Sequence, residues 1–372
     1  MGITKLADLI RSDAVSYKDI SDYTGKVIAF DTSVVLNQFQ AATPSLSPLT
    51  GVFFRTLTFL EHDIKPVFVF DGKPPVEKTP VLERRAQAAG WSPPKRTGMA
   101  SSQTNDAIEL LKHIGVPVIQ VQLVLVSTHI PSHFLILTLH AQDFTFQAPG
   151  DAEALCAKLV RVGVVDAVAS EDMDTLPFGS NILIRQLNAK RDSEVMEYSL
   201  PKLLEKLQIN HEELVDLCIL LGCDYCDKIP GLGPKRALTL IQNHRTIENV
   251  VLHINRKTHP VPQFWKYKEA RKIFLDATET TVPELVWTEP DEEAVVGFLC
   301  HTKHVKEERI RHRMKTFHKN RENRREKRKM EKAAGYSRQT RMENFFRITR
   351  KREQPVEAPS SLGDSNKRPR SK

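Results

Sequence analysis

Three short apolar segments in the first half of the chain each end at acidic residues, and this pattern limits the folds open to it. The segments are rich in Val, Ile and Phe, and helical patterns of apolar residues lie between them. The segments span residues 27–30, 66–70 and 166–169, and the helical patterns span 51–61, 106–114 and 152–162. Because such runs are typical of strands buried on both faces, we expect an α/β fold with a mostly parallel central sheet flanked by helices.

Four regions follow one another along the chain. Residues 1–105 contain the first strand-like and helical segments and a basic, proline-rich segment, and residues 106–240 continue the alternation of strand-like and helical segments. Residues 241–334 are expected to be helical, and residues 335–372 to form a disordered basic tail, because they lose apolar periodicity. No apolar run reaches the roughly 18 residues that a membrane helix needs, so we expect no membrane partner.

The charge is distributed unevenly. The chain carries 54 Lys and Arg against 46 Asp and Glu, a net charge of +8. Residues 303–372 hold 24 basic and 9 acidic residues, a net +15, which leaves −7 for residues 1–302. A basic arm on an acidic body is typical of a polyanion-binding protein, provided that some of the carboxylates in the body hold metal ions.

Seven carboxylates are expected to meet at one edge of the sheet. Some end strands, some begin a helix after residue 150, and one opens the helical module that follows; they are Asp31, Asp71, Asp151, Glu153, Asp172, Asp174 and Asp224. Any single one could be a helix cap or a turn residue. Together they favour a site for Mg²⁺ or Mn²⁺, and two such ions about 4 Å apart are a common device for phosphodiester hydrolysis.

Other catalytic patterns are weak. Five cysteines are too few for a disulfide scaffold and indicate a reducing compartment. Cys223 and Cys226 lack a second pair or a His at zinc spacing, so we interpret them as two thiols. The sequence contains no Walker loop, no GxGxxG and no evident Ser/His/Asp arrangement.

Three further segments point to polyanions or partners. The turn at 229–236 contains Gly231 and Gly233, followed by Lys235 and Arg236; it could be purely structural or could hold a phosphate at a helix start. Residues 311–332 carry 11 basic and 3 acidic residues, which fits a solvated helix or phosphate contacts. In the tail segment 339–346, Gln339, Met342, Phe345 and Phe346 have the spacing of a short helical turn that fills an apolar pocket.

Six motifs together resemble the flap endonucleases, the structure-specific 5′ nucleases of the XPG type. They are MGI, VIAFDTS, KPVFVFDGKPP, DAEALCAKLV, SEDMDTLPFG and LCILLGCDYCDKIPGLGPKRA, and the tail peptide QTRMENFF is similar to the family's sliding-clamp-binding box. The resemblance implies a helical arch and a helix–turn–helix DNA-binding module. It also implies a 5′ flap endonuclease with 5′→3′ exonuclease activity, acting in Okazaki fragment maturation and long-patch base excision repair.

Site residues are implied by the same resemblance. One Mg²⁺ would be held by Asp31, Asp71, Asp151 and Glu153 and a second by Asp172, Asp174 and Asp224, with Mn²⁺ able to substitute. Lys78 and Arg85 would be catalytic; DNA contacts would come from Arg55, Asp151, Gly222, Asp224, Gly231, Gly233, Lys235 and Arg236, with K⁺ at the turn. The clamp (PCNA) would bind residues 339–346 of a monomer in the nucleus, with the nucleolus and mitochondrion as further locations.

The chain departs from the family pattern in several places. Asp151 stands where the family has Glu, Asn37 where it has a stacking Tyr, and the arch at 73–105 is short. Residues 121–147 form an apolar insert without a clear period where a connection of about 2–6 residues is usual, and we interpret it as translated intron. These departures motivate one alternative, a catalytically weakened paralogue that binds DNA and the clamp. A second alternative is a relative that cuts bubbles or four-way junctions, but the clamp-binding box and the short connection between Asp71 and Asp151 argue against it.

Overall fold

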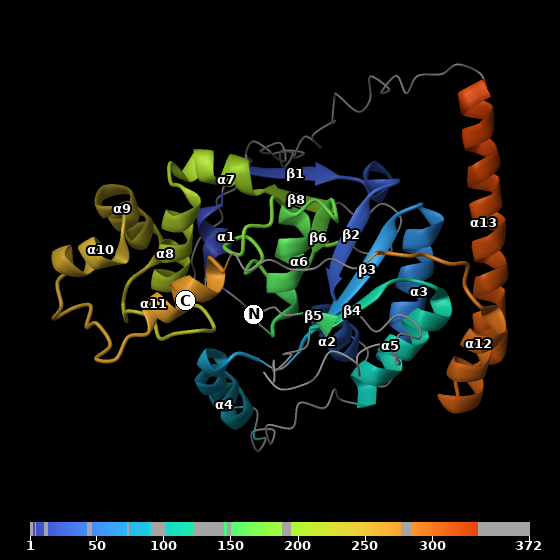
Figure 1. Ribbon diagram of the computed structural model, residues 1–372, viewed down its shortest axis with the longest axis horizontal. Helices are drawn as coiled ribbons and strands as arrows, with labels where there is room; N and C mark the ends of the chain where they lie inside the picture. Colours follow the sequence, from blue (N-terminus) through green and yellow to red (C-terminus); the bar gives the residue numbers. More distant parts are fainter. Residues whose placement is uncertain are drawn as a thin grey trace, which may run out of the picture. The chain divides into compact units, whose positions relative to one another are not determined.

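An eight-stranded, mostly parallel sheet lies at the centre of the protein (Figure 1). The computed structural model describes residues 3, 5–10, 14–42, 47–72, 74–88, 90, 102–121, 145–146, 150–187, 195–276 and 284–333. The strands are β1 (Val15–Lys18), β2 (Val27–Asp31), β3 (Lys65–Phe70), β4 (Val118–Val121), β5 (Thr145–Phe146), β6 (Ala167–Ala169), β7 (Ile182–Arg185) and β8 (Val195–Ser199). They are ordered β1-β8-β7-β6-β2-β3-β4-β5. Only the β1–β8 and β7–β8 pairs among them are antiparallel, so the predicted fold class is confirmed.

Helices cover both faces of the sheet. They are α1 (Leu6–Leu9), η2 (Ile20–Tyr23), α2 (Thr32–Ala42), α3 (Pro48–Glu61), η3 (Val76–Lys78), α4 (Thr79–Ala88), α5 (Ser102–Ile114), α6 (Ala152–Arg161), α7 (Leu200–Leu207), α8 (His211–Leu221), α9 (Pro234–His244), α10 (Ile247–His253), α11 (Tyr267–Phe274), α12 (Glu292–Val296), η4 (Gly297–Thr302) and α13 (Glu307–Ala333). The predicted helices at 51–61, 106–114 and 152–162 correspond to α3, α5 and α6.

Alternate residues of the central strands face two different cores. In β2 and β3, Phe30 and Phe68 stack with ring centroids 5.3 Å apart in the core formed with α3 and α5. Ala29 and Val67 point to the opposite face, where they pack against α6. Because both faces are buried, these strands consist of nearly continuous apolar residues, and the sheet holds its carboxyl edge in a fixed position.

A third core builds the helical module that follows the sheet. Apolar residues of α7, α8, α9, α10 and α11 pack together, and Figure 1 shows these helices gathered at one end of the sheet. Asp216 of α8 ties the module together, because it accepts hydrogen bonds from Arg271 at 2.7 and 2.8 Å and from the backbone N–H of Ile247 at 3.0 Å. The predicted turn at 229–236 joins α8 to α9 within this module.

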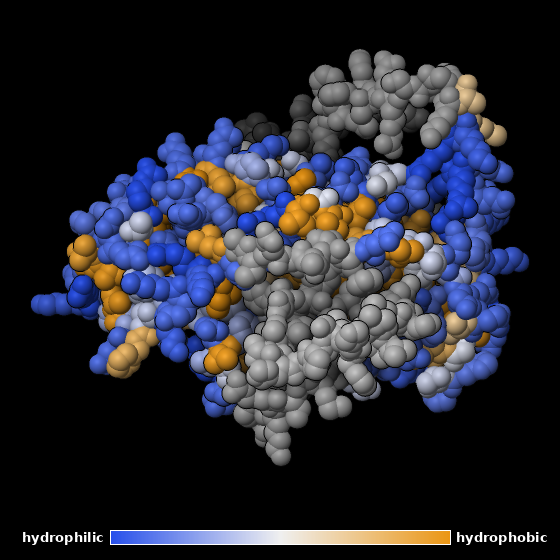
Figure 2. All heavy atoms as spheres, in the orientation of Figure 1, coloured by the Kyte–Doolittle hydropathy of each residue, from blue (hydrophilic) through white to orange (hydrophobic). Residues whose placement is uncertain are grey.

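The chain divides into two compact units, Met1–Glu322 and Asn323–Lys372. In the first unit α13 buries Ile310, Met314 and Phe317 at helical spacing. Several of its basic residues pair with acids; Arg311, for example, lies 2.7 Å from both Glu293 and Glu307. The exposed face of α13 is hydrophilic (Figure 2). The last part of α13, from Asn323 to residue 333, belongs to the second unit.

The atypical insert is described only at its ends. Val121 closes β4, and residues 145–146 form β5, which pairs with β4 at the edge of the sheet. Most of the segment 121–147 lies outside the described residues, as do the tail peptide 339–346 and most of the segment between α4 and α5. Among the described residues, no helix combines the length and the apolar character that crossing a membrane requires.

Candidate active site

The structure brings the predicted carboxylates together at the carboxyl edge of the parallel strands. Asp31 is the last residue of β2, and Asp71 directly follows β3. Asp151 is the N-cap residue of α6, and Glu153 lies in its first turn. Asp172 and Asp174 follow β6, and Asp224 follows α8. Asp71 and Asp172 lie close enough to Asp31 to raise its pKa, and Asp172 and Asp224 lie close enough to Asp174 to raise its pKa. Asp151, Asp31 and Asp71 likewise raise the pKa of Glu153, so the structure brings the seven acids together.

Some of these acids also cap helices, as the alternative interpretation allowed. Asp71 accepts a hydrogen bond from the backbone N–H of Ala152 at 2.8 Å, at the start of α6. Asp31 accepts one from Val34 at 3.3 Å, in the first turn of α2. The two interpretations are therefore compatible, because one carboxylate oxygen can fix a helix start while the other faces the cluster.

Two cations of the arch neutralise part of the cluster. The Lys78 ammonium lies 2.9 Å from Asp151, 3.5 Å from Glu153 and 3.7 Å from Asp224. Arg85 of α4 donates two hydrogen bonds to Asp224, at 2.7 and 3.1 Å. Burial alone would lower the pKa of Lys78, but the Glu153 and Asp151 carboxylates outweigh it and raise that pKa. Both residues therefore contact the acids, and their catalytic role stays a prediction.

The remaining negative charge is not balanced. Burial, and then the Asp71 carboxylate, raise the pKa of Asp31 to about 7. Burial also raises the pKa of Glu153 and of Asp174 well above their usual range. A cation bound beside such buried carboxylates would favour their ionised form, and a set of hard oxygen donors suits divalent ions such as Mg²⁺.

The donor set therefore fits divalent cations, although the side chains are arranged around Lys78. Within the described residues, no three Asp, Glu, His or Cys side chains stand in positions to hold one metal ion together. Both oxygens of Asp151 are engaged, Oδ1 by Lys78 and Oδ2 by Tyr225. The assignment of four acids to one ion and three to the other thus stays a prediction.

Three residues that contact the cluster were missed by sequence reasoning. The Tyr225 hydroxyl donates to Asp151 at 2.6 Å, and its side chain is buried. The Ser170 hydroxyl donates to Asp31 at 3.3 Å and accepts from the backbone N–H of Asp172 at 3.1 Å. The backbone N–H of Ile3 donates to Asp174 at 2.6 Å. Tyr225 and Ser170 stand beside predicted acids in the sequence, and that proximity is the only signal that could have found them.

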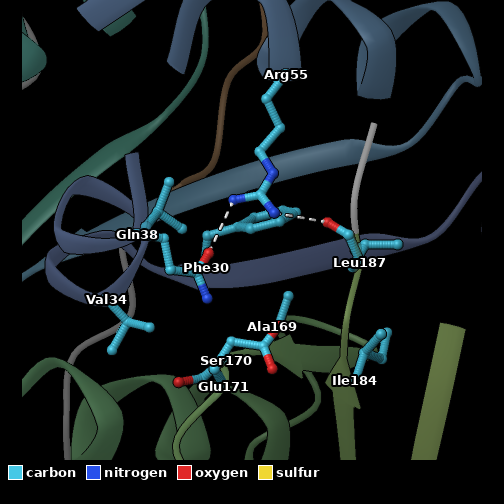
Figure 3. A pocket seen from close by; sticks show the side chains of 10 residues that line it. Phe30, Val34, Gln38, Arg55, Ala169, Ser170, Glu171, Ile184 and Leu187 are labelled. Atoms are coloured by element: carbon cyan, nitrogen blue, oxygen red, sulfur yellow. Dashed lines mark hydrogen bonds between the residues drawn. The ribbon is translucent and has the colours of Figure 1, made fainter. Parts of the chain in front are cut away.

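The predicted DNA contact Arg55 lines a small cavity of about 20 Å³ (Figure 3). Its guanidinium donates to the Leu187 carbonyl at 3.1 Å and to the Gln38 side chain at 3.4 Å. Burial lowers the pKa of Arg55, and the Glu171 carboxylate opposes that change. The structure thus commits Arg55 to internal contacts, and its role toward DNA stays a prediction.

The glycines of the predicted phosphate turn differ in their surroundings. Gly231 has a φ of +74°, and a Cβ there would meet the ring of His259 at 3.3 Å. Gly233 is the N-cap residue of α9, and a Cβ there would meet nothing within 4 Å. Lys235 and Arg236 are exposed in the first turn of α9. The start of α9 therefore presents an open, basic surface of the kind that holds a phosphate.

A groove of about 630 Å³ separates α4 from the loop 222–230. Gly222, with a φ of +108°, ends α8 on one side of it, and Arg84 of α4 pairs with Asp227 of the loop at 3.3 Å. Cys226 also lines this groove, and its sulfur lies 3.8 Å from that of Cys223. Both cysteines are free thiols, as the sequence interpretation expected.

Comparison with known proteins defines first the class and then the family. Residues 1–90 match the XPG N-terminal domain and residues 145–224 the XPG I-region. The structure is similar to the catalytic core of Rad2 in complex with DNA substrate, with a TM-score of 0.66 at 20% identity over 85% of this chain and 100% of that one, which shows the shared fold. These matches define the class as XPG-type.

Two full-length relatives give the family. The chain is 55% identical over 358 residues to the "Probable flap endonuclease 1 homolog" of Danio rerio, with 95% of each chain covered. It is 37% identical over 388 residues to "Flap endonuclease 1" of Salmo salar, covering 99% of this chain and 96% of the relative. The chain belongs to the flap endonuclease family, whose members are metal-dependent DNA nucleases that hydrolyse phosphodiester bonds.

Proposed function

We propose that this chain is a structure-specific 5′ flap endonuclease with 5′→3′ exonuclease activity that uses two Mg²⁺ ions. The observation that supports this proposal most is the cluster of seven carboxylates around Lys78 at the carboxyl edge of the sheet. Mn²⁺ is expected to substitute, because it prefers the same oxygen ligands. When bound, the two ions supply Lewis-acid stabilisation of the attacking and leaving oxygens of the phosphodiester.

The protein side chains position the scissile phosphate. The Arg85 side chain is 43% exposed, whereas Asp224 is 12% exposed, so Arg85 can turn toward a phosphate that enters from the groove side. Lys78 is held deeper, where its ammonium faces three carboxylates. Both are charge-assisted donors, which bind phosphate oxygens about twice as strongly as neutral donors do. We assign them the role of drawing the phosphate against the acidic edge.

The helical module is proposed to hold the duplex. The open start of α9 at Gly233, with Lys235 and Arg236 exposed beside it, is suited to phosphate contacts, and K⁺ at the turn 229–236 would strengthen them. The 1–105, 106–240 and 241–334 regions would together form this nuclease body. We further propose that residues 339–346 bind the sliding clamp (PCNA), and that the protein acts as a monomer in the nucleus, in Okazaki fragment maturation and long-patch base excision repair.

The test is cleavage of labelled double-flap, bubble and four-way-junction DNA in Mg²⁺ by the full chain. We expect the double flap to be cut fastest, and Asp172→Ala to abolish cutting. Asp166→Ala is the matched control, since Asp166 precedes β6 at the other end of that strand and binds Lys26 and the backbone of Val27, both at 2.8 Å. Equal cutting by wild type and Asp172→Ala, or preference for bubbles or junctions, would refute the proposal.

One observation favours the alternative of a catalytically weakened paralogue that binds DNA and the clamp. Asp151 is a methylene shorter than the Glu of the family, and both of its oxygens are already bonded. A chain of this kind would bind flap DNA in a gel-shift assay without cutting it in Mg²⁺ or in Mn²⁺. Cutting in either metal that Asp172→Ala abolishes would rule this alternative out.

A further inference from the structure

The loop that carries Asp224 is flanked by two thiols in contact with each other. Cys223 and Cys226 lie directly before Asp224 and directly after Tyr225, and their sulfurs are 3.8 Å apart. We propose that peroxide oxidises this pair to a disulfide, which displaces Asp224 and Tyr225 and stops DNA cleavage until a dithiol reduces it. The effect on cleavage rests on the proposed function; formation of the disulfide does not.

The geometry sets this pair apart from the other cysteines of the chain. Both cysteines line the groove beside α4, so a small oxidant can reach the pair, although Cys223 is only 8% exposed. Cys156, Cys218 and Cys300 are buried. A disulfide bond is about 2.05 Å long, so the two sulfurs must approach by about 1.7 Å, a change within reach of a loop without helical or strand structure.

The chemistry balances with hydrogen peroxide as the oxidant. One sulfur of the pair attacks the O–O bond; an S–O bond forms, the O–O bond breaks, and one water leaves with the thiol proton. The second sulfur then attacks the sulfenic sulfur; the S–S bond forms, the S–O bond breaks, and a second water leaves. Two thiols are oxidised by two electrons in total, and both peroxide oxygens are reduced to water.

The disulfide acts on the site through the two residues between the sulfurs. Asp224 is bonded to Arg85, and Tyr225 donates to Asp151 at 2.6 Å. The Trp265 indole N–H, bonded to the Asp227 carbonyl at 2.5 Å, holds the residue directly after Cys226, so the movement falls on the residues between the sulfurs. A misplacement of about 1 Å at a reacting group can reduce a rate about 100-fold, so we expect at least a tenfold loss of cleavage.

The first experiment detects the disulfide without reference to activity. The reduced full chain is treated with hydrogen peroxide, its free thiols are alkylated, and the peptides are mapped by mass spectrometry. We expect a bond between Cys223 and Cys226 that dithiothreitol reverses, that still forms in the control Cys300→Ser and that is lost in Cys226→Ser. Full alkylation of both thiols after peroxide, or a bond to Cys218 instead, would overturn the proposal.

The second experiment measures the consequence. Cleavage of double-flap DNA and Mn²⁺ affinity by calorimetry are compared for the reduced and oxidised forms of wild type and Cys226→Ser. We expect both quantities to fall at least tenfold on oxidation of wild type only, and to recover with dithiothreitol. A disulfide that leaves both unchanged overturns the switch. If even the reduced protein cuts no flap, the proposed function fails, and Mn²⁺ affinity alone decides the switch.

Discussion

The hydrogen bond between Tyr225 and Asp151 is the contact whose removal tests the site most directly. Tyr225→Phe deletes one oxygen atom and keeps the ring, which packs edge-on against Phe274 with centroids 5.2 Å apart and against Phe178 at 6.2 Å. The hydroxyl is 2.6 Å from Asp151 and stabilises the ionised carboxylate, so it lowers the Asp151 pKa against the opposing effect of burial. The variant therefore makes Asp151 harder to ionise without opening a cavity in the core.

The magnitude follows from the strength of such bonds. A hydrogen bond to a charged group contributes about 1.5–3 kcal/mol, and each 1.4 kcal/mol corresponds to a factor of ten in an equilibrium constant. A divalent ion requires the ionised carboxylate, so Tyr225→Phe should weaken Mn²⁺ binding about 10- to 150-fold. The Mg²⁺ concentration needed for half-maximal cleavage should rise by a similar factor.

Calorimetric Mn²⁺ titration without DNA is the assay, with the Mg²⁺ dependence of flap cleavage as a second readout. Tyr23→Phe is the matched control, because the buried Tyr23 hydroxyl donates to Glu197 at 3.1 Å, away from the acidic edge. The control should lose stability but keep its metal affinity. Unchanged Mn²⁺ affinity in Tyr225→Phe would refute the reasoning, and tighter binding would show that Tyr225 competes with the ion for Asp151.

Three further predictions concern other parts of the chain. Arg271 holds the pKa of Glu248 at about 2, below its ordinary 4.5, so the stability from this ion pair is complete above pH 4.5 and is lost as the pH falls toward 2. When urea unfolding is compared at pH 5 and pH 3, Glu248→Gln should therefore lose less stability than wild type does, and the difference should stay under about 1 kcal/mol because the pair is partly exposed. Gly231→Ala should destabilise the fold by about 1–2 kcal/mol, because Gly231 has a positive φ. Gly233→Ala should leave the melting temperature unchanged and weaken duplex binding, and equal losses of melting temperature in the two variants would contradict this prediction. Deleting 121–147 should leave a folded protein that cuts flap DNA at least as well, because the described part of the segment is only the last residue of β4 and the edge strand β5. Insoluble protein would contradict this, and transcripts that all carry the segment would refute an intron origin.

The sequence predicted the centre of the sheet better than its edge. β2 and β3 are buried on both faces, and their continuous apolar runs are visible without any structure. β1 and β8 are only partly buried, and their segments VSYK and VMEYS mix polar and apolar residues. Such segments become strands because a neighbour supplies their hydrogen bonds, and that neighbour is not apparent from the local pattern.

The same limit applies to the site. Six of the acids could be predicted because they lie at the end of a strand, just after one or at the start of a helix, and parallel strands bring their carboxyl ends to one edge. Asp224, in the loop after α8, was found from the family motif as well as from its place in the helical module. The partners of the acids could not be predicted from this pattern: Tyr225 is 74 residues from Asp151 in the sequence, and Ser170 is 139 residues from Asp31. These distances depend on how the helical module packs against the sheet, which involves side chains from every part of the chain.

The charge balance of the acidic edge links metal binding to DNA binding. Buried carboxylates remain ionised only beside cations, and in the protein alone Lys78 and Arg85 provide them. Divalent ions that take over Asp151 and Asp224 would release both side chains from these ion pairs. The released cations are then available to the phosphate of the substrate, so each ligand favours the binding of the other. The residues that neutralise the site in the free protein are thus the ones proposed to bind the substrate when metal is present.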